Sequence, residues 1–270
     1  MDVSIFSETM ADMSWQELEQ RKGEIVLLPL GVIEEHGPHL PLGADIYFSY
    51  GVCKRVQEHV KRMGGHCLIA PPIYWGINYC TSAFPGSFSL RPETMKMMLA
   101  DIFADLNRFG FEKILCINEH GDPLHIGTIL EAVMAANKKG MQVQLLMEPY
   151  EINDYKVTEL NCVLADEAQY PPELFGESEG LDIHAGAYET AALYGLYPEM
   201  KKCTEGLKDY SLNRETLRSW MSGGEMARMV VPLGYAGNPA GYNKIKNSVE
   251  KIFEILSQFI AGKVMEMSNE

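Results

Sequence analysis

The residues best suited to chemistry lie in a short segment, EEHGPHLPLGAD, which runs from residue 34 to residue 45. It combines Glu34, His36 and Asp45 with glycines and prolines, which rule out a regular helix and indicate a shaped loop. Glu34 and His36 are two residues apart, so an extended backbone would point both the same way. Carboxylates with an imidazole suit Zn²⁺, Mn²⁺ or Fe²⁺. A polar loop that merely caps a strand is the alternative, but this density of ligands favours a metal site.

A second cluster, NEHGDPLH, covers residues 118–125 and repeats the same spacing with His120 and Asp122. Two such pairs at the ends of neighbouring strands could face each other across one or two metal ions. Divalent ions held in this way would activate a water and polarise a carbonyl group. The alternative is an Asp–Pro turn with incidental histidines.

The third cluster contains His184, which precedes a predicted helix over residues 187–194, and Glu189, which lies one turn inside that helix. A histidine at a helix entrance can act as an acid–base group, and a glutamate farther in can bind a metal or join the catalysis. The alternative is a capped helix with an ordinary exposed glutamate.

Positioning these clusters requires strands that end beside one another. Short apolar runs predict strands over residues 24–33, 66–73, 113–118, 143–150 and 229–234, and amphipathic spacing predicts helices over 46–63, 92–109 and the C-terminal stretch. Strands that alternate with helices indicate an α/β fold with a mostly parallel sheet. In such sheets, sites form beyond the C-terminal strand ends, where the polar clusters lie.

The bulk composition excludes several classes of protein. A length of 270 residues without a linker or repeat predicts a single domain over residues 1–270. The net charge of −14 argues against nucleic acid and anionic membranes as partners. The six cysteines lack CxxC spacing, which favours free thiols, and the polar N-terminus does not resemble a signal peptide. We therefore expect a cytoplasmic protein that acts on a small molecule.

The clusters, in this order and at this spacing, resemble the creatininase (creatinine amidohydrolase) family. The resemblance rests on the segment over 34–45, on FPGSFSLRPET over 84–94, on NEHG over 118–121 and on HAGAYET over 184–190. It implies a three-layer α/β/α sandwich with a short, mostly parallel central sheet. It also implies two divalent metal ions (Zn, Mn or Fe) per chain, ring-opening hydrolysis, usually of a cyclic amide, and a homo-oligomer, often a hexamer.

Carried over position by position, the resemblance implies roles for single residues. Glu34, His36, Asp45 and His120 are similar to the family's metal ligands, with Asp45 as the bridge. A further carboxylate ligand is either Asp122 or Glu189. His184 resembles the acid–base residue beside the substrate, with Glu189 near it.

The chain departs from creatininase around the substrate. Residues 150–183 contain no tryptophan, and Ile183 rather than glutamate precedes His184. We expect the pocket walls to come from Tyr74, Trp75, Asn78 and Tyr79. The expected function is a metal-dependent hydrolase that opens a small cyclic amide at its C–N bond. One alternative is a C–C hydrolase that opens a cyclic polyol ketone such as a dehydro-inosose, and the second is a non-catalytic metal-binding scaffold.

Overall fold

A single five-stranded sheet forms the centre of the computed structural model, which describes residues 7–175 and 180–269. The strands are β1 (Ile25–Leu30), β2 (Cys67–Ile69), β3 (Lys113–Asn118), β4 (Gln142–Met147) and β5 (Val163–Ala165). Their spatial order is β2-β1-β3-β4-β5, and each neighbouring pair is parallel. The predicted parallel sheet is therefore confirmed.

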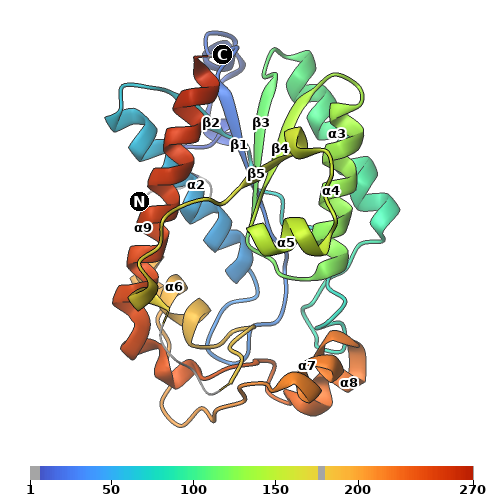
Figure 1. Ribbon diagram of the computed structural model, residues 1–270, viewed down its shortest axis with the longest axis vertical. Coiled ribbons are helices and arrows are strands. Elements are labelled where there is room, and N and C mark those ends of the chain that lie inside the picture. The colour runs from blue at the N-terminus through green and yellow to red at the C-terminus, as the bar shows by residue number, and fades with distance from the viewer. Residues whose placement is uncertain (1–6, 176–179, 270) are drawn as a thin grey trace.

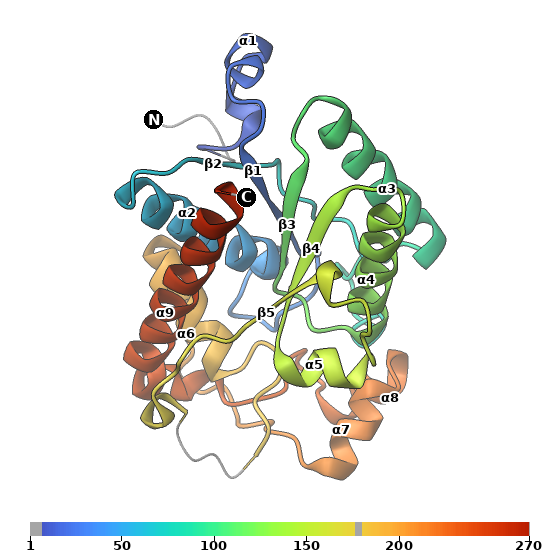
Figure 2. The same ribbon diagram turned by 45° about the horizontal axis from the view of Figure 1, so that its top comes forward.

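Helices cover both faces of this sheet (Figures 1 and 2). One layer contains α2 (Ala44–Arg62), α6 (Ala187–Leu196) and α9 (Tyr242–Ser268). The opposite layer contains α3 (Pro92–Arg108) and α4 (Pro123–Asn137), which pack against each other. This arrangement confirms the three-layer α/β/α sandwich.

Strand β1 shows why the sheet needs two covering layers. Ile25 and Leu27 belong to the apolar cluster with α2, α6 and α9, whereas Val26 and Leu28 belong to the cluster with α3 and α4. A strand that is buried on both faces reads as a continuous apolar run rather than as an alternating one. The unbroken apolar run that predicted this strand is therefore explained by the helix layers on both faces of the sheet.

The shorter elements gather mostly at the C-terminal end of the strands. α5 (Pro149–Asp154) follows β4 directly, and α7 (Arg214–Met221) and α8 (Gly224–Val230) lie at the same end of the molecule (Figure 1). At the other end, α1 (Trp15–Glu19) precedes β1 (Figure 2). Short 3₁₀ helices complete the order at Met10–Asp12, Leu160–Cys162, Pro172–Leu174, Pro198–Met200 and Pro239–Gly241.

The predicted strand over residues 229–234 is wrong. Its first two residues end α8, and the backbone then turns, with the Gly234 amide donating to the carbonyl of Val231. Gly223 and Gly224 both have positive φ and turn the chain directly from α7 into α8, so the apolar run never meets the sheet. The apolar residues instead pack around Ala227 and Val231 in a small separate cluster.

Two further properties concern the whole chain. All six cysteines are free thiols, as predicted, and all but Cys203 are buried. Among the described residues, no helix combines the length and the apolar character that a membrane span requires.

Candidate metal centre and active site

The metal-site candidates meet because β1 and β3 are adjacent parallel strands. Leu30 pairs with Asn118 at the ends of these strands, so the segments that follow them leave the sheet side by side. Glu34 and His36 come from the segment after β1, and His120 comes from the segment after β3. The sheet topology thus brings together residues that are more than eighty positions apart in the sequence.

Asp45, in the first turn of α2, lies between two imidazole rings. Its Oδ1 atom is 3.0 Å from Nε2 of His36, and its Oδ2 atom is 3.0 Å from Nδ1 of His120. The residue is buried, and Oδ2 has no hydrogen-bond partner of acceptable geometry. A buried carboxylate oxygen without such a partner is costly unless a cation compensates it.

The hydrogen bonds of His120 fix which of its nitrogens faces this carboxylate. Nε2 lies 3.0 Å from the carbonyl oxygen of Ile77, which can only accept, so Nε2 carries the proton. The lone pair of Nδ1 then points at Glu34 Oε2 and Asp45 Oδ2, each 3.0 Å away. Three electron-rich atoms in such proximity require a proton or a metal ion among them.

His36 repeats this arrangement on the other side of Asp45. Its Nδ1 atom donates to the Glu34 carbonyl at 3.0 Å, which leaves Nε2 facing Asp45 Oδ1 at 3.0 Å and Glu189 Oε2 at 3.6 Å. Thr81 donates its hydroxyl proton to Glu34 Oε1 at 2.5 Å and thereby orients that carboxylate. Each histidine donates a hydrogen bond to a backbone carbonyl, and such a bond is what orients an imidazole that binds a metal ion.

The electrostatics show that the cluster attracts positive charge. Burial by itself would lower the pKa of His36, but Asp45 outweighs burial and the pKa rises to about 9. The pKa of His120 is likewise raised well above its usual value, against burial, by Glu34 and Asp45. Despite burial, the pKa of Asp45 is lowered, chiefly by His36. In the absence of metal, protons supply the charge that this donor set requires.

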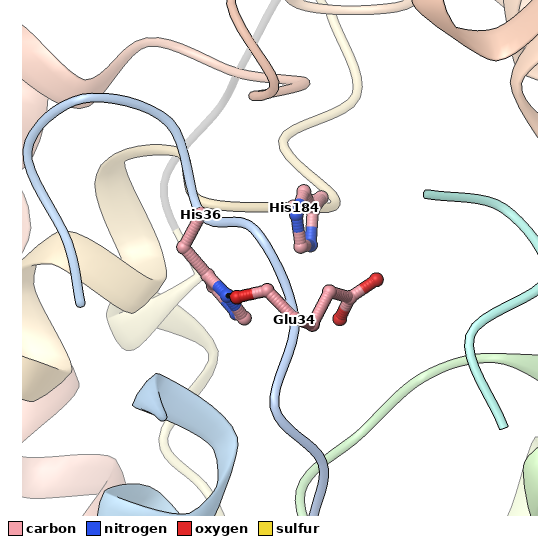
Figure 3. A group of neighbouring side chains, drawn as sticks. All are labelled: Glu34, His36 and His184. Carbon is pink, nitrogen blue, oxygen red and sulfur yellow. Dashed lines mark hydrogen bonds between the residues drawn. The ribbon is translucent and has the colours of Figure 1, made fainter. Parts of the chain in front are cut away.

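Two overlapping groups have ligand atoms close enough to hold an ion. Within each of them, the ligand atoms lie within 4.8 Å of one another. The first group is Glu34, Asp45 and His120, and the second is Glu34, His36 and His184, shown in Figure 3. Buried carboxylates and imidazoles with fixed tautomers match the donor chemistry of divalent zinc, manganese or iron. The residues present therefore fit a divalent metal centre.

His184 is fixed by its backbone as well as by its ring. Its amide and carbonyl pair with Ala236, and the next residue, Ala185, has a φ of 47°, so the chain turns sharply after the histidine. Nε2 donates to the Glu35 carbonyl at 2.8 Å, and the ring centre lies 4.5 Å from that of His36. Burial opposes protonation, but Glu34 and Glu35 raise the pKa of His184 to about 10.

Asp122 has a structural role in this conformation. It is the N-cap of α4, where its Oδ1 atom accepts hydrogen bonds from the amides of Leu124 and His125 at 2.9 and 3.3 Å. Its Oδ2 atom accepts hydrogen bonds from the amides of Tyr79 and Cys80 at 2.7 and 3.1 Å. Both oxygens are thus engaged with the backbone.

Glu189 is placed more favourably as the further carboxylate ligand. Its Oε2 atom lies 3.6 Å from Nε2 of His36 and accepts a hydrogen bond from the Ala185 amide at 2.7 Å. The geometry therefore favours Glu189 over Asp122, although both assignments stay predictions.

A cavity of about 690 Å³ opens onto this cluster. Trp220 of α7 lines it and packs on His184, with ring centres 5.3 Å apart and planes inclined at 32°. The four residues expected to form the pocket walls (Tyr74, Trp75, Asn78 and Tyr79) lie outside its lining, so that expectation gains no support. The Asn78 side chain instead donates to the carbonyls of Ile33 and Phe88.

Sequence reasoning missed Trp220, Thr81 and the contact of Glu35 with His184. Trp220 lies in a short polar helix far along the chain, where no pattern connects it with a histidine. Thr81 follows a cysteine in an irregular segment. Glu35 was visible between two predicted ligands, but only the fold places its buried Oε1 atom 3.5 Å from His184 Nε2.

Comparisons with known proteins identify the family to which the chain is similar. The profile of the creatininase family, described as creatinine amidohydrolase, matches residues 11–262. The chain is 31% identical to creatinine amidohydrolase of Pseudomonas putida, an alignment that covers 74% of this chain and 75% of that one. It is 24% identical to 3-dehydro-scyllo-inosose hydrolase of Thermotoga maritima, in an alignment that covers 93% of this chain and 85% of the relative. It is 28% identical to a mycofactocin precursor peptide peptidase of Mycolicibacterium smegmatis, with 80% of this chain and 74% of that one covered.

Solved structures show the same fold. A crystal structure of creatinine amidohydrolase superimposes with a TM-score of 0.68 at 22% identity, and covers 97% of this chain and 98% of its own. A further creatininase structure, named as a manganese form, superimposes with a TM-score of 0.68 at 21% identity and covers 98% of this chain and 100% of its own. With its residues 11–262 matched by the family profile, the chain belongs to the creatininase family of hydrolases.

Proposed function

We propose that this chain is a metal-dependent amidohydrolase that opens a small cyclic amide at its C–N bond. The observation that carries the proposal is the buried carboxylate of Asp45, which lies 3.0 Å from each of two imidazole nitrogens whose tautomers are fixed by backbone carbonyls. A single carboxylate between two such nitrogens is suited to bridging two divalent ions. The 31% identical relative named creatinine amidohydrolase supports the reaction class.

In this proposal, Asp45 is shared between two sets of ligands. Glu34 and His120 complete one set, and His36 and Glu189 complete the other. The bound ions would lower the pKa of a water toward neutrality and polarise the substrate carbonyl. The chain holds the ligands for this purpose through Thr81, which orients Glu34, and through the carbonyl groups that orient both imidazoles.

His184 is proposed to move the proton. Its Nε2–H group is held by the Glu35 carbonyl, so Nδ1 is the nitrogen that can accept a proton and deliver it to the leaving nitrogen. The Trp220 ring and the His36 ring lie against the imidazole and limit its rotation. The cavity that contains His184 also provides room for a substrate next to the metal-site candidates.

The test combines metal analysis with turnover. Protein stripped of metal and reloaded separately with Zn²⁺, Mn²⁺ or Fe²⁺ is incubated with creatinine and other small cyclic amides, and products are identified by mass spectrometry. We expect two ions per chain and hydrolysis by the loaded protein alone. Asp45→Asn should lose both metal and turnover, whereas Asp101→Asn, on the exposed face of α3, should keep both. Full metal content and turnover in Asp45→Asn would overturn the proposal.

A second candidate reaction is hydrolysis of a C–C bond in a cyclic polyol ketone. The relative named 3-dehydro-scyllo-inosose hydrolase aligns over 93% of this chain, and carboxylate and tyrosine oxygens in the cavity could accept hydrogen bonds from several hydroxyl groups. Incubation with an inosose in the same screen separates the two reactions by the mass of the product. The non-catalytic scaffold is disfavoured, because the acid–base candidate His184 is held in place as firmly as the ligand candidates.

We also propose a cytoplasmic homo-oligomer, with the hexamer that the family resemblance implies, built from a single domain over residues 1–270. Leu42, Trp75 and Phe88 are large, exposed apolar side chains, as expected at a subunit interface. The buried free thiols suit a reducing compartment. Light scattering after gel filtration tests the oligomer, a single unfolding transition tests the domain, and cell fractionation tests the location.

A further inference from the structure

One histidine of the second sequence cluster, His125, lies beside the candidate metal ligands but outside the cavity. It belongs to the first turn of α4, is 1% exposed and does not line the cavity, so it contacts no substrate there. Both of its ring nitrogens are engaged by the protein. Nδ1 accepts a hydrogen bond from the Ile77 amide at 3.2 Å, and Nε2 donates one to Asn118 Oδ1 at 3.0 Å. Neither nitrogen therefore has a lone pair free for a metal ion.

These two hydrogen bonds belong to a closed circuit around His120. The Nδ2 group of Asn118 donates to the His120 carbonyl at 2.8 Å, and the Nε2–H group of His120 donates to the Ile77 carbonyl at 3.0 Å. The circuit thus leaves His120 at its backbone, passes through three other residues and returns to the His120 ring. It joins the end of β3, the start of α4 and the segment after β2, which are separate in the sequence.

Each member of this circuit has a single possible role. A backbone carbonyl can only accept a hydrogen bond, so the His120 carbonyl orients the Asn118 amide group with Oδ1 toward His125. Nε2 of His125 then carries the proton, and Nδ1 is the acceptor that the Ile77 amide requires. At the other end, the Ile77 carbonyl holds the proton of His120 on Nε2. The lone pair of His120 Nδ1 is thereby left facing the two carboxylates of its ligand group.

Packing adds to the effect of these hydrogen bonds. The rings of His120 and His125 meet edge to face, with centres 4.9 Å apart and planes inclined at 76°. His125 also lies against the backbone of Gly76, where an added Cβ atom would be 2.5 Å from Nδ1 of the ring. The glycine therefore lets the imidazole approach the Ile77 amide. A rotation of the His120 ring would break a hydrogen bond and disturb this packing.

Loss of the acceptor on His125 would leave the Ile77 amide unpaired. An unpaired amide at this buried position would cost about 1–3 kcal/mol. The segment around Ile77 could recover that free energy only by shifting, and the Ile77 carbonyl would move with it. The His120 ring could then adopt the other tautomer or turn about its own axis, so metal binding would have to fix the ring again and would be weaker.

We propose that His125 is a positioning residue for the metal centre, which acts through the backbone of Ile77 to fix the tautomer and the orientation of His120. This inference rests on the proposed function only in taking His120 as a metal ligand. The effect is confined to the ion that His120 binds, because the ring of His36 is oriented by the Glu34 carbonyl and lies outside the circuit.

The test compares two substitutions of nearly equal size. His125→Asn keeps an acceptor close to the position of Nδ1, whereas His125→Leu removes it, and both lose the hydrogen bond to Asn118. Metal-stripped protein is titrated with Zn²⁺ in competition with a chromogenic chelator. We expect His125→Leu to weaken the binding of one of two ions by about tenfold, at the lower end of the effects known for groups that orient metal ligands. His125→Asn should retain most of the affinity.

Two comparisons separate positioning from a general loss of stability. Thr128→Val removes another hydrogen bond of α4, which the Thr128 hydroxyl donates to the Leu124 carbonyl, and should leave the Zn²⁺ affinity unchanged. In a His120→Gln background, His125→Leu should not weaken the binding of the remaining ion any further, because the ring that it positions is absent. Circular dichroism and the melting temperature show whether each variant is folded.

The outcomes distinguish this inference from the proposed function. Unchanged Zn²⁺ affinity in His125→Leu, equal losses in His125→Leu and His125→Asn, or a loss as large in Thr128→Val would overturn the positioning role, even if the protein binds two ions and hydrolyses a cyclic amide. A full loss in the His120→Gln background would overturn it as well. A loss that depends on His120, in a protein that hydrolyses none of the amides tested, would support the positioning role and count against the proposed function.

Discussion

Removing the metal should make the stability of this protein strongly dependent on pH. In the metal-free protein, the pKa of His36 is raised from 6.5 to about 9, because Asp45 outweighs the burial of the ring. A group whose pKa is higher in the folded state stabilises that state fully below its unfolded pKa. This stabilisation is lost as the pH rises from 6.5 through about 9.

The size of the effect follows from the shift. A difference of this size corresponds to about 3 kcal/mol of folding free energy. For a protein of this length, that is a fall in melting temperature of roughly 6–12 °C. His184, whose pKa is raised to about 10, acts in the same direction at still higher pH. A bound metal ion would replace the proton on His36, so the loaded protein should show little of this fall.

The assay is thermal unfolding of chelator-treated and metal-loaded protein between pH 6.5 and 10. We expect the gap between their melting temperatures to widen as the pH rises, because deprotonation destabilises one form and favours metal binding in the other. Asp45→Asn should weaken the dependence of the melting temperature on pH in the metal-free protein, and Asp101→Asn should leave that dependence unchanged. Parallel curves for the two forms, or metal-free protein that becomes more stable toward pH 9, would refute the reasoning.

Three further predictions concern single residues. His184→Gln should keep the metal but lower kcat by about 100-fold or more, and metal analysis with steady-state kinetics on an identified substrate checks this; unchanged kcat would rule out the acid–base role. Asp122→Asn should keep the metal but cost about 1–3 kcal/mol, because its NH₂ group cannot accept the hydrogen bonds that the Tyr79 and Cys80 amides donate to Oδ2, whereas Glu189→Gln should lose metal; the reverse pattern would make Asp122 the ligand. Gly186→Ala should destabilise the folded protein by about 1–3 kcal/mol, because its Cβ would lie 1.8 Å from Asp182 Oδ1, and a wild-type melting temperature would contradict the crowding.

The sequence predicted the strands and helices correctly wherever their local apolar pattern agrees with their place in the fold. The apolar runs of β1 and β3 and the amphipathic helix α3 are long and regular, so their periodicity was sufficient to place them. Strand β5 has only three residues and pairs with β4 alone, which is too short for a pattern. α4 was missed because its Asp–Pro start also reads as a turn. The strand predicted over residues 229–234 was wrong because the apolar residues of this run pack against side chains of α7 and α8 and not against the sheet.

The sequence was sufficient to predict the candidate metal ligands, but not the backbone contacts and the cavity walls around them. Glu34, His36, Asp45 and His120 lie in dense motifs at strand ends, and the parallel pairing of β1 with β3 brings these motifs together. Whether Asp122 faces a metal or caps a helix depends on which backbone amides surround it, and those of residues 79 and 80 come from a distant segment. The walls of the cavity come from loops and from α5, α6, α7 and α9, which lie far apart in the chain and meet only in the folded protein, so these residues could not be deduced from the sequence.

The sheet topology accounts both for the metal-site candidates and for the cavity onto which they open. Four adjacent parallel strands end at one cavity, and the side chains just beyond them divide into two sets along the order β1-β3-β4-β5. Carboxylates beyond β1 and β3 alternate with histidines and so suit metal ions, whereas Glu148 and Asp166, beyond β4 and β5, line the cavity together with tyrosines. Because strands are spaced about 5 Å apart, the two sets are separated by roughly the length of a small molecule. A substrate that spans them would place its carbonyl at the metal-ligand candidates while the rest of the molecule contacts the residues beyond β4 and β5, so reaction class and substrate choice can change independently.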